Sequence, residues 1–362
     1  MTGLLPEGFH DRLPPAADAA ARVEARVLGV AHGYGYEQVD PPLAEFAEAL
    51  ASRLKAGGMR DAVRFVDPAS QQTLAIRPDI TAQVGRIAAT RMAHHPRPVR
   101  LSYAGPVLKL RASQLRPERA MRQIGCELIG LDSVAAASEI VRVAVEALGQ
   151  AGVEGVAIDF TLPDLVDTLA GESLPPARLA DLRERLDGKD AGGVAAIAPD
   201  YLPLIEAAGP FDAAMARLRG IEALQSRLDG LAQVAASLPD GVALTLDPTE
   251  RHGFEYQSWL GFSIFARGVR EEIGRGGTYV IVHEDGREEP AVGFSLYADP
   301  ILDAGIGAGD RRRLFLPFGT DPARGADLRR EGWVTVAALE AEDTPRAQLC
   351  SHILGSAGPQ PV

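Results

Sequence analysis

The segment Arg122–Leu128 constrains the fold more than any other stretch of this chain, because polar or small residues alternate in it with apolar ones. In a β-strand, residues two apart share a face, so Gln123, Gly125 and Glu127 line one face and the apolar residues between them line the other. The chain must therefore build a sheet that buries at least the apolar face. The polar face has two interpretations. It is either the floor of a site for a small polar ligand, which the glycine allows to approach the backbone, or an ordinary solvated outer face.

Helical and extended patterns follow one another in an order typical of an α+β fold. A helix is predicted over residues 16–31, a second from Ile80 to Met92, and a third that begins after the cap Asp132-Ser133 and ends near Gly152. The predicted strands are Val63–Val66, Thr73–Ile76, Val99–Leu110, Arg119–Leu131, Val242–Leu246, Ser258–Phe265 and Thr278–His283, with a hairpin turn at Gly286.

The predicted sheet is mostly antiparallel and flanked by helices. Residues 161–240 consist mainly of helical pieces separated by Gly and Pro, and we interpret them as a helical insertion between two halves of the sheet domain. The resulting organisation is a large domain over residues 1–305 and a small C-terminal α/β unit over residues 306–362. Within the small unit we expect a strand, a helix, a strand and a helix at Leu314–Pro317, Ala323–Arg330, Val334–Ala338 and Arg346–Leu354.

Charge and composition exclude several classes of function. The 362 residues carry a formal net charge of -12, which disfavours nucleic acid as a partner, because phosphate backbones attract basic surfaces. Cys126 and Cys350 lie far apart and neither has a metal-ligand spacing, so we predict two unreactive thiols and no metal site. No apolar run reaches the length of a membrane span and the N-terminus lacks a signal pattern. The expected location is the cytoplasm.

Three further places combine polar residues or glycines at the ends of predicted elements. Asp79 and Thr81 occupy a strand-to-helix junction, where the ordinary interpretation is a helix cap. The segment His252–Tyr256 leads into a predicted strand. The glycines of Gly274–Tyr279 precede another strand, which is a weak signal that usually means a tight turn or close packing. They do not form a nucleotide-binding loop, since the strand-then-helix context of such loops is missing.

The order of these segments resembles the class II synthetase fold, and is most similar to histidyl-tRNA synthetase. The similarity runs from Pro6 to about Leu302 and implies a class II synthetase-like antiparallel sheet. Six segments show this similarity. Gly8–Tyr36 resembles the family's first motif, Leu74–Thr81 its "LRPE-x-T" segment, and Met121–Gly130 the second half of motif 2. His252–Tyr256 resembles the "RGLDYY" motif, Gly276–Tyr279 the "GGRYDGL" segment, and Pro290–Phe294 the start of motif 3.

The resemblance implies a pocket for histidine. A bound amino acid brings a buried ammonium, which needs carboxylates and other acceptors to offset its desolvation, and Glu127 can accept from an imidazole N–H. Tyr256 matches the first tyrosine of the "RGLDYY" pair, whereas Gln257 replaces the second. The residues implied as histidine ligands are Asp79, Thr81, Gln123, Glu127, Tyr279 and Tyr256, with Lys109, Gly125 and Gly277 as neighbours of the pocket.

The cations that synthetases use to bind ATP are altered. Arginines of motif 2, "RGLDYY", "GGRYDGL" and motif 3 align with Lys109, His252, Thr278 and Pro300. A lysine is a point charge that cannot form the bidentate fork of an arginine, and the other three positions lose the guanidinium altogether. Four changes at one site argue against adenylation, which needs cations to stabilise the charge of the triphosphate. We therefore predict no catalytic residue and no cofactor.

A synthetase-like chain with these departures and only a short tail after Leu302 resembles the family of regulatory subunits of ATP phosphoribosyltransferase. That resemblance implies a short-form catalytic subunit as partner, with which such chains form a hetero-octamer. It also implies self-association through the motif 1 region, a place at the first step of histidine biosynthesis, and L-histidine as feedback effector. Two alternatives stay open: a divergent histidyl-tRNA synthetase or other adenylating paralogue, and a binding module unrelated to histidine.

Overall fold

The computed structural model describes residues 4–51, 62–111, 118–170, 175–250, 257–309 and 312–362. The chain divides into two compact units, Met1–Gly307 and Ala308–Val362. None of the helices in these ranges combines the length and the apolar character that a membrane span needs.

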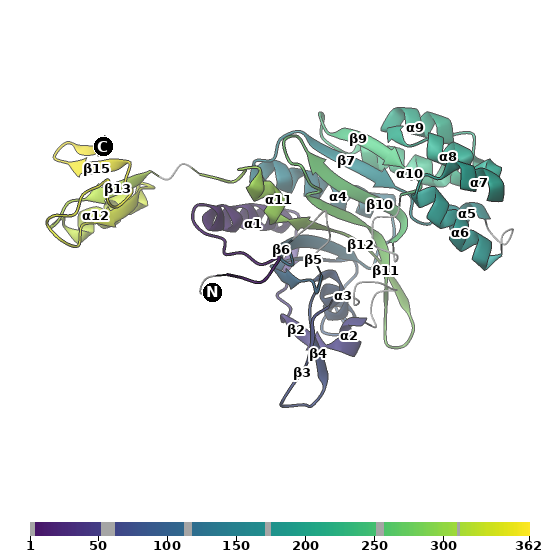
Figure 1. Ribbon diagram of the computed structural model, residues 1–362, viewed down its shortest axis with the longest axis horizontal. Helices are drawn as coiled ribbons and strands as arrows, with labels where there is room; N and C mark the ends of the chain where they lie inside the picture. Colours follow the sequence, from purple (N-terminus) through teal and green to yellow (C-terminus); the bar gives the residue numbers. More distant parts are fainter. Residues whose placement is uncertain (1–3, 52–61, 112–117, 171–174, 251–256, 310–311) are drawn as a thin grey trace. The chain divides into compact units, whose positions relative to one another are not determined.

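The first unit is built on a large mixed sheet, as the α+β prediction requires (Figure 1). Within the described ranges it has nine strands in the order β1-β5-β6-β12-β11-β10-β7-β9-β8. The pairs β1–β5 and β7–β9 are parallel and the other neighbours are antiparallel. The strands are β1 (Glu37–Gln38), β5 (Val99–Leu108), β6 (Ala120–Ile129), β7 (Val156–Thr161), β8 (Gly209–Pro210), β9 (Ala243–Asp247), β10 (Gln257–Ala266), β11 (Gly274–Val282) and β12 (Glu288–Tyr297).

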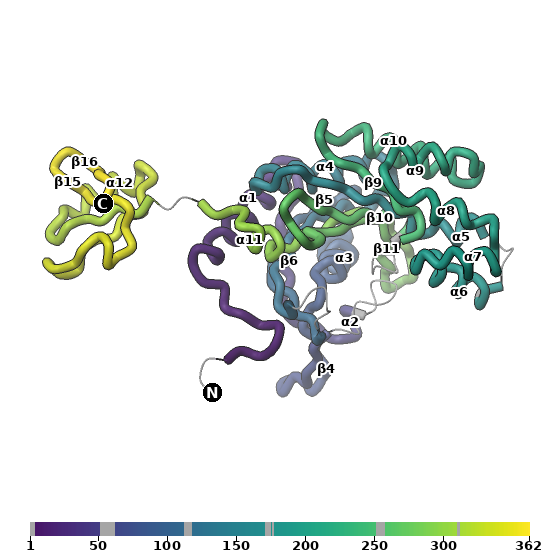
Figure 2. The backbone as a smooth tube through the Cα atoms, turned by 45° about the horizontal axis from the view of Figure 1, so that its top comes forward, coloured from purple at the N-terminus to yellow at the C-terminus, as the bar shows by residue number. Residues whose placement is uncertain are grey.

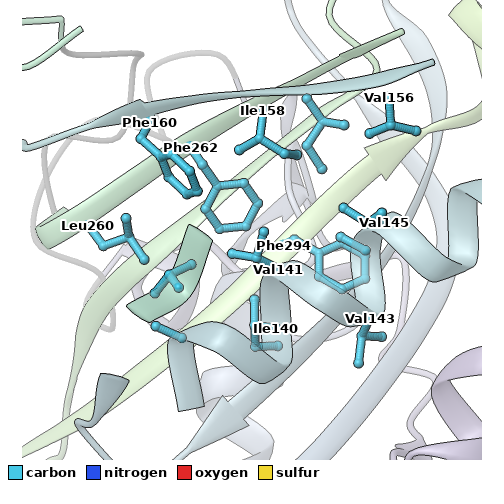
Figure 3. Packing of buried hydrophobic residues seen from close by; sticks show 14 of the residues in the cluster. Ile140, Val141, Val143, Val145, Val156, Ile158, Phe160, Leu260, Phe262 and Phe294 are labelled. Atoms are coloured by element: carbon cyan, nitrogen blue, oxygen red, sulfur yellow. The ribbon is translucent and has the colours of Figure 1, made fainter. Parts of the chain in front are cut away.

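Two long helices, α1 (Ala16–Gly33) and α4 (Val134–Ala151), cover one face of this sheet. The side chain of Ser133 accepts a hydrogen bond from the backbone N–H of Ala136, and Gly152 ends α4 with φ 92°, so both predicted ends of this helix are confirmed. Side chains of α4 and of the strands point toward one another and form one continuous apolar core (Figure 3). Fully buried members of this core include Ile140, Val141, Ile158, Phe160 and Phe294.

The opposite face of the sheet carries the helix α3 (Thr81–Ala89) and a small sheet. Ile80, Val84 and Ala88 pack from the α3 side against Leu101 and Tyr103 of β5. This second cluster is smaller than the core under α4 and leaves room on the same face for polar side chains. In the described part of the chain the small sheet has three strands, β2 (Ala44–Phe46), β4 (Thr73–Ile76) and β3 (Arg64–Val66), and α2 (Ala47–Ala51) lies beside it.

A group of short helices follows β7 and returns the chain to β9 (Figure 2). Part of this insertion shares the main core through Phe211, Leu218 and Leu231, whereas Leu182 and Leu186 belong to a separate small cluster. Its elements are α5 (Leu165–Ala170), α6 (Pro176–Asp187), α7 (Ala191–Ile197), a 3-10 helix (Pro199–Tyr201), α8 (Leu202–Glu206), α9 (Phe211–Leu218), a second 3-10 helix (Glu222–Leu224) and α10 (Gln225–Ala236).

The C-terminal unit corrects one prediction. The segment Arg346–Leu354, expected as a helix, contains the strand β15 (His352–Gly355), which pairs with β13 (Arg313–Leu316) and with β16 (Gly358–Pro361). The segment forms a strand because Leu354 then packs against the apolar cluster of Leu314, Leu316 and Leu328. This burial of apolar surface outweighs the local helix propensity of the segment. The remaining elements are α12 (Pro322–Arg330) and β14 (Val334–Ala337), as the sequence predicts.

Replacing Ile140 with alanine tests the core under α4. The side chain is 0% exposed, so Ile140→Ala leaves a cavity and lowers the free energy of unfolding by about 2–5 kcal/mol. Urea denaturation followed by circular dichroism measures the loss. The control is Gln150→Ala on the exposed surface of the same helix, which we expect to change stability by less than about 0.5 kcal/mol. Equal losses in the two variants would contradict this packing.

Candidate functional site

Polar side chains from β5, β6, β11, β12 and the start of α3 meet on the face of the large sheet that lies opposite α4. We call this group the polar cluster. It contains most of the residues that the sequence singled out as ligands, together with two that it did not. The members of the polar cluster are Asp79, Thr81, Tyr103, Gln123, Glu127, Tyr279 and Ser295.

The position of β6 between β5 and β12 buries its polar face. Gln123 is 0% exposed and Glu127 is 1% exposed. The alternative of a solvated outer face is therefore wrong, although the predicted alternation is confirmed, since Ile124 and Cys126 lie in the core under α4. Because neither Gln123 nor Glu127 reaches water, their polar atoms must find partners inside the protein.

Gln123 connects three parts of the cluster through its side-chain amide. Its Oε1 accepts a hydrogen bond from the backbone N–H of Ile80 at 2.9 Å. Its Nε2 donates to Asp79 Oδ2 at 2.8 Å and to Ser295 Oγ at 2.7 Å. A backbone N–H can only donate, so the Ile80 contact fixes which end of the amide is oxygen. Gln123 thereby ties the start of α3 to β12.

Asp79 caps the start of α3 with one carboxylate oxygen and joins the polar cluster with the other. Its Oδ1 accepts from the backbone N–H of Thr81 at 2.8 Å, which satisfies a free donor at the beginning of α3. Its Oδ2 is held by Gln123 within the polar cluster. Asp79 is the partly exposed member of the cluster, whereas Thr81 is buried. The carboxylate therefore stands between the buried cluster and solvent.

Glu127 is the fully buried carboxyl of the cluster. Its Oε1 accepts from the Tyr103 hydroxyl at 3.1 Å and its Oε2 from the Tyr279 hydroxyl at 2.8 Å. Burial raises the pKa of Glu127 to about 8, and the charge of Asp79 adds to this, while the hydroxyls of Tyr279, Tyr103 and Thr81 lower it. Near neutral pH the carboxyl therefore changes charge in response to small changes in its surroundings.

Glycines give these side chains the space they need. A side chain at Gly125 would overlap the Tyr103 ring, and one at Gly293 would overlap the carboxylate of Glu127. Gly277 pairs with Gly293, which in turn pairs with Glu127, so these three residues form a row on the same face of the sheet. Gly125 and Gly277, the predicted pocket neighbours, thus lie beside the cluster.

Sequence reasoning missed Tyr103 and Ser295. The two residues pair with Gly125 from either side, Tyr103 from β5 and Ser295 from β12, and their hydroxyl oxygens are 3.0 Å apart. The signal that could have found them is Gly125 itself, because a glycine in a central strand often marks a place where a neighbour needs its volume. The strand pairing that identifies those neighbours is not written in the local sequence.

Tyr256, with the rest of His252–Tyr256, falls outside the described residues. Lys109 is described and is not a member of the polar cluster. Lys109 follows the end of β5, where its backbone N–H donates to the carbonyl of Arg119 at 2.8 Å and it forms a bridge with Ala62. Lys109 thus lies beyond the end of the strand that supplies Tyr103.

The altered cation positions Thr278 and Pro300 have structural partners of their own. The Thr278 hydroxyl accepts from the backbone N–H of Leu260 at 3.1 Å, at an irregularity in the pairing of β10 with β11. Pro300 is buried in the first turn of the helix α11 (Ala298–Asp303), and its neighbour Asp299 forms an ion pair with Arg12. No group of His, Cys, Asp or Glu in the described ranges is arranged to hold a metal ion.

Comparison with known proteins places this geometry in context. A family model described as histidyl-tRNA synthetase matches residues 8–301. A protein of Rhodospirillum centenum named ATP phosphoribosyltransferase regulatory subunit is 46% identical over 97% of this chain and 94% of its own length. A protein of the same name from Gluconobacter oxydans is 34% identical over 99% of this chain and 97% of its own length.

Solved structures share the fold. A protein of Bacillus halodurans, described as an ATP phosphoribosyltransferase regulatory subunit/histidyl-tRNA synthetase, superposes with a TM-score of 0.80 at 22% identity over 96% of each chain. The histidyl-tRNA synthetase of Nostoc sp. PCC 7120 gives a TM-score of 0.78 at 14% identity over 98% of this chain and 92% of its own. The predicted class II synthetase-like fold is thereby confirmed.

Adding a methyl group at Gly293 tests the packing around Glu127. We expect Gly293→Ala to lower the free energy of unfolding by about 1–3 kcal/mol, because the new carbon overlaps the carboxylate in a closely packed interior. The control is Gly149→Ala in α4, where the added carbon meets nothing within 4 Å apart from its chain neighbours and the backbone of its own helix. Alanine favours helix, so this control should gain up to about 1 kcal/mol. Urea denaturation measures both, and a Gly293→Ala protein as stable as the parent would contradict the packing.

The stability of the ligand-free protein should depend on the charge of Glu127. The unfolded chain titrates this carboxyl near 4.5 and the folded chain near 8, so its contribution to stability is fully present below pH 4.5 and is lost as pH rises through 8. Each unit of pKa difference corresponds to about 1.4 kcal/mol. Thermal unfolding from pH 5 to pH 9 should show a falling Tm, and Glu127→Gln should remove this part of the fall. Parallel curves for the two proteins would contradict the buried titration.

Proposed function

The chain belongs to the family of ATP phosphoribosyltransferase regulatory subunits, and from that membership we propose that it binds L-histidine and controls the catalytic subunit of that enzyme without catalysing a reaction itself. The observation that carries this proposal is the polar cluster. It keeps a buried carboxyl, two phenols and a second carboxylate close together in a chain that a histidyl-tRNA synthetase family model matches over residues 8–301.

The two ends of the polar cluster suit the two ends of the ligand. The ammonium of an amino acid needs acceptors to offset its desolvation, and Asp79, Thr81 and Gln123 supply oxygens at the partly exposed end. An imidazole N–H needs an acceptor at the buried end, where Glu127 lies. We propose that Tyr279 and Tyr256 complete the pocket, with Gly125, Gly277 and Lys109 around it.

Loss of adenylation is the second half of the proposal. Thr278 uses its hydroxyl to hold β10, and Pro300 lies in the first turn of α11, where the preceding residue Asp299 forms an ion pair with Arg12. Thr278 and Pro300 provide no guanidinium for a triphosphate. We therefore assign no catalytic residue, cofactor or metal to this chain.

The proposed partner is the short-form catalytic subunit of ATP phosphoribosyltransferase, at the first step of histidine biosynthesis. The regulatory chain is needed there for full activity and for feedback inhibition, and assembles with its partner as a hetero-octamer in the cytoplasm. Self-association is proposed through the region of α1 and the residues that precede it. Nucleic acid and membranes are not proposed as partners, in keeping with the net charge of -12.

Feedback control requires only a modest coupling between the histidine site and the catalytic subunit. A difference of about 1–3 kcal/mol in the affinity for histidine between the active and the inhibited assembly suffices. Histidine bridges groups from α3, β6 and β11, so its binding changes the relative stability of arrangements of these elements.

Reconstitution with the catalytic subunit tests the proposal. The complex should form the phosphoribosyl product and L-histidine should inhibit it, while the chain alone should show no histidine-dependent exchange of pyrophosphate into ATP. Glu127→Ala should raise the concentration of histidine needed for half-inhibition by at least about tenfold, since one partner of a buried polar contact is lost. The matched control is Glu139→Ala, which removes a carboxylate on the α4 side of the sheet and should leave inhibition unchanged.

Two outcomes would contradict the proposal. If the Glu127→Ala complex is half-inhibited at the same histidine concentration as the parent complex, Glu127 does not belong to the histidine site. If the chain exchanges pyrophosphate into ATP in a histidine-dependent reaction, it is an adenylating enzyme, which is the alternative that its fold allows.

A further inference from the structure

The proposed ligand has three polar groups, and the polar cluster accounts for two of them. Oxygens of Asp79, Thr81 and Gln123 suit its ammonium, and Glu127 suits its ring N–H. The third group is the carboxylate. The polar cluster contains two carboxyl groups and no lysine or arginine. A carboxylate bound beside them needs a cationic partner from elsewhere to offset its desolvation.

The arginines of the large sheet are divided between its two faces. Its nine described strands contain three arginines and no lysine. Arg100 pairs with Glu139 of α4, and Arg122 pairs with Glu24 of α1, so both lie on the face that these two helices cover. The third arginine is Arg275 of β11.

Arg275 lies on the face of the polar cluster. A side chain at the next residue, Gly276, would meet the ring of Phe262, which belongs to the core under α4, so Arg275 points to the opposite face. Arg275 is paired directly with Ser295, whose hydroxyl accepts a hydrogen bond from Gln123. The Cβ atoms of such a pair are about 5 Å apart. The side chain of Arg275 therefore starts one strand away from the polar cluster.

A row of glycines lies between Glu127 and the strand position of Arg275. In register with Glu127 are Gly293 on β12, Gly277 on β11 and Gly261 on β10, all on the same face. Arg275 stands two residues along β11 from Gly277. Two strand spacings and two residues along a strand separate the Cα atoms of Glu127 and Arg275 by about 12 Å. Two long side chains at this separation can meet the two ends of one amino acid.

Glu272, which precedes β11, holds the guanidinium of Arg275. The Nε of Arg275 donates to Glu272 Oε1 at 2.7 Å, and one Nη donates to Oε2 at 2.5 Å. Both side chains are largely buried. A guanidinium has five N–H donors in a rigid fork, so one carboxylate can fix its orientation while it binds a second. The alternative is an ion pair that only stabilises the turn between β10 and β11.

Two other cations near this face are less suited to the carboxylate. Lys109 lies four residues beyond Gly105, the partner of Gln123 in β5, which is about 13 Å along the strand. Arg77 is 2% exposed, and its guanidinium donates to two backbone carbonyls and to Gln83. Arg77 thus serves to join the start of α3 to the chain around it.

We propose that Arg275 binds the carboxylate of the ligand and makes the site specific for a free amino acid. The proposal rests on the proposed function, because it takes the ring to lie against Glu127 and the ammonium against Asp79 and Gln123. The three polar groups of the ligand are then held by residues from three places in the fold, namely the start of α3, β6 and β11.

Two ligands that differ at the carboxylate test this assignment. L-Histidinol keeps the ring and the ammonium of L-histidine but has a CH₂OH group in place of the carboxylate. Both are titrated calorimetrically into the full chain, alone and in complex with the catalytic subunit, and the rise of Tm at high ligand concentration extends the comparison to weak binding. The readout is the ratio of the Kd for histidinol to the Kd for histidine.

We expect Arg275→Ala to weaken histidine binding by at least about tenfold and histidinol binding by less than about twofold, so that the ratio falls. Arg275→Gln should lower the ratio similarly and serves if Arg275→Ala does not fold. Arg275→Lys keeps the charge without the fork and should recover part of the ratio.

Three controls surround these variants. Arg100→Ala removes an arginine that is held by Glu139 in the same bidentate way on the opposite face, and should keep the parent ratio. Glu272→Gln breaks the ion pair but keeps the guanidinium, so the ratio should not fall. Lys109→Ala removes the competing cation and should also keep the parent ratio.

The outcomes separate this proposal from the proposed function. A fall of the ratio in Arg275→Ala or Arg275→Gln, with parent ratios in the controls, supports it. An unchanged ratio in these two variants, whether both ligands bind as before or are weakened alike, overturns it and leaves the proposed function intact, as does a fall in Lys109→Ala alone. Absence of histidine binding to the parent chain, both alone and with the catalytic subunit, overturns the proposed function and this proposal with it.

Discussion

The alternation of side chains along β6 is the constraint from which the rest of this protein follows. One set of side chains, including Ile124 and Cys126, packs into the core beneath α4. The other set, Gln123 and Glu127, is buried as fully by β5, β12 and α3. A strand that is buried on both faces usually carries apolar residues on both. Here one face is polar, so the surrounding elements must supply hydrogen-bond partners, and the backbone of Ile80 and the hydroxyls of the polar cluster do so.

Burial of Glu127 costs stability that its partners only partly recover. The two phenols that donate to it favour the ionised carboxylate, yet burial dominates and its pKa stays near 8. A purely structural interior would avoid this cost, because an apolar side chain of similar volume packs there without desolvating a charge. A buried carboxyl that titrates near neutral pH, beside a partly exposed second carboxylate, is typical of a place where a ligand completes the set of contacts.

The sequence predicted the parts of this arrangement that depend on local pattern. Alternation along β6, the cap at Ser133 and the turn at Gly152 each arise within a few residues, and each is confirmed. Tyr103 and Ser295 were not predicted as site residues, because their roles depend on which strands pair with β6, and strand pairing is a property of the whole sheet. The strand β15 was mistaken for a helix for the same reason, since its pairing with β13 overrides a short and ambiguous local pattern.

The polar cluster and the altered cation positions differ in a way that bears on function. In the polar cluster, Glu127 keeps two phenol donors and an unfavourable desolvation. At the altered positions, Pro300 lies in the first turn of α11, and the preceding residue Asp299 forms an ion pair with Arg12 through one carboxylate oxygen. A chain that used this fold only as a scaffold would gain stability by replacing Glu127 with an apolar side chain of similar volume. Retention of the buried carboxyl accords with the proposed role as a sensor of the amino acid, because a ligand N–H that donates to Glu127 favours its ionised form and offsets part of its desolvation.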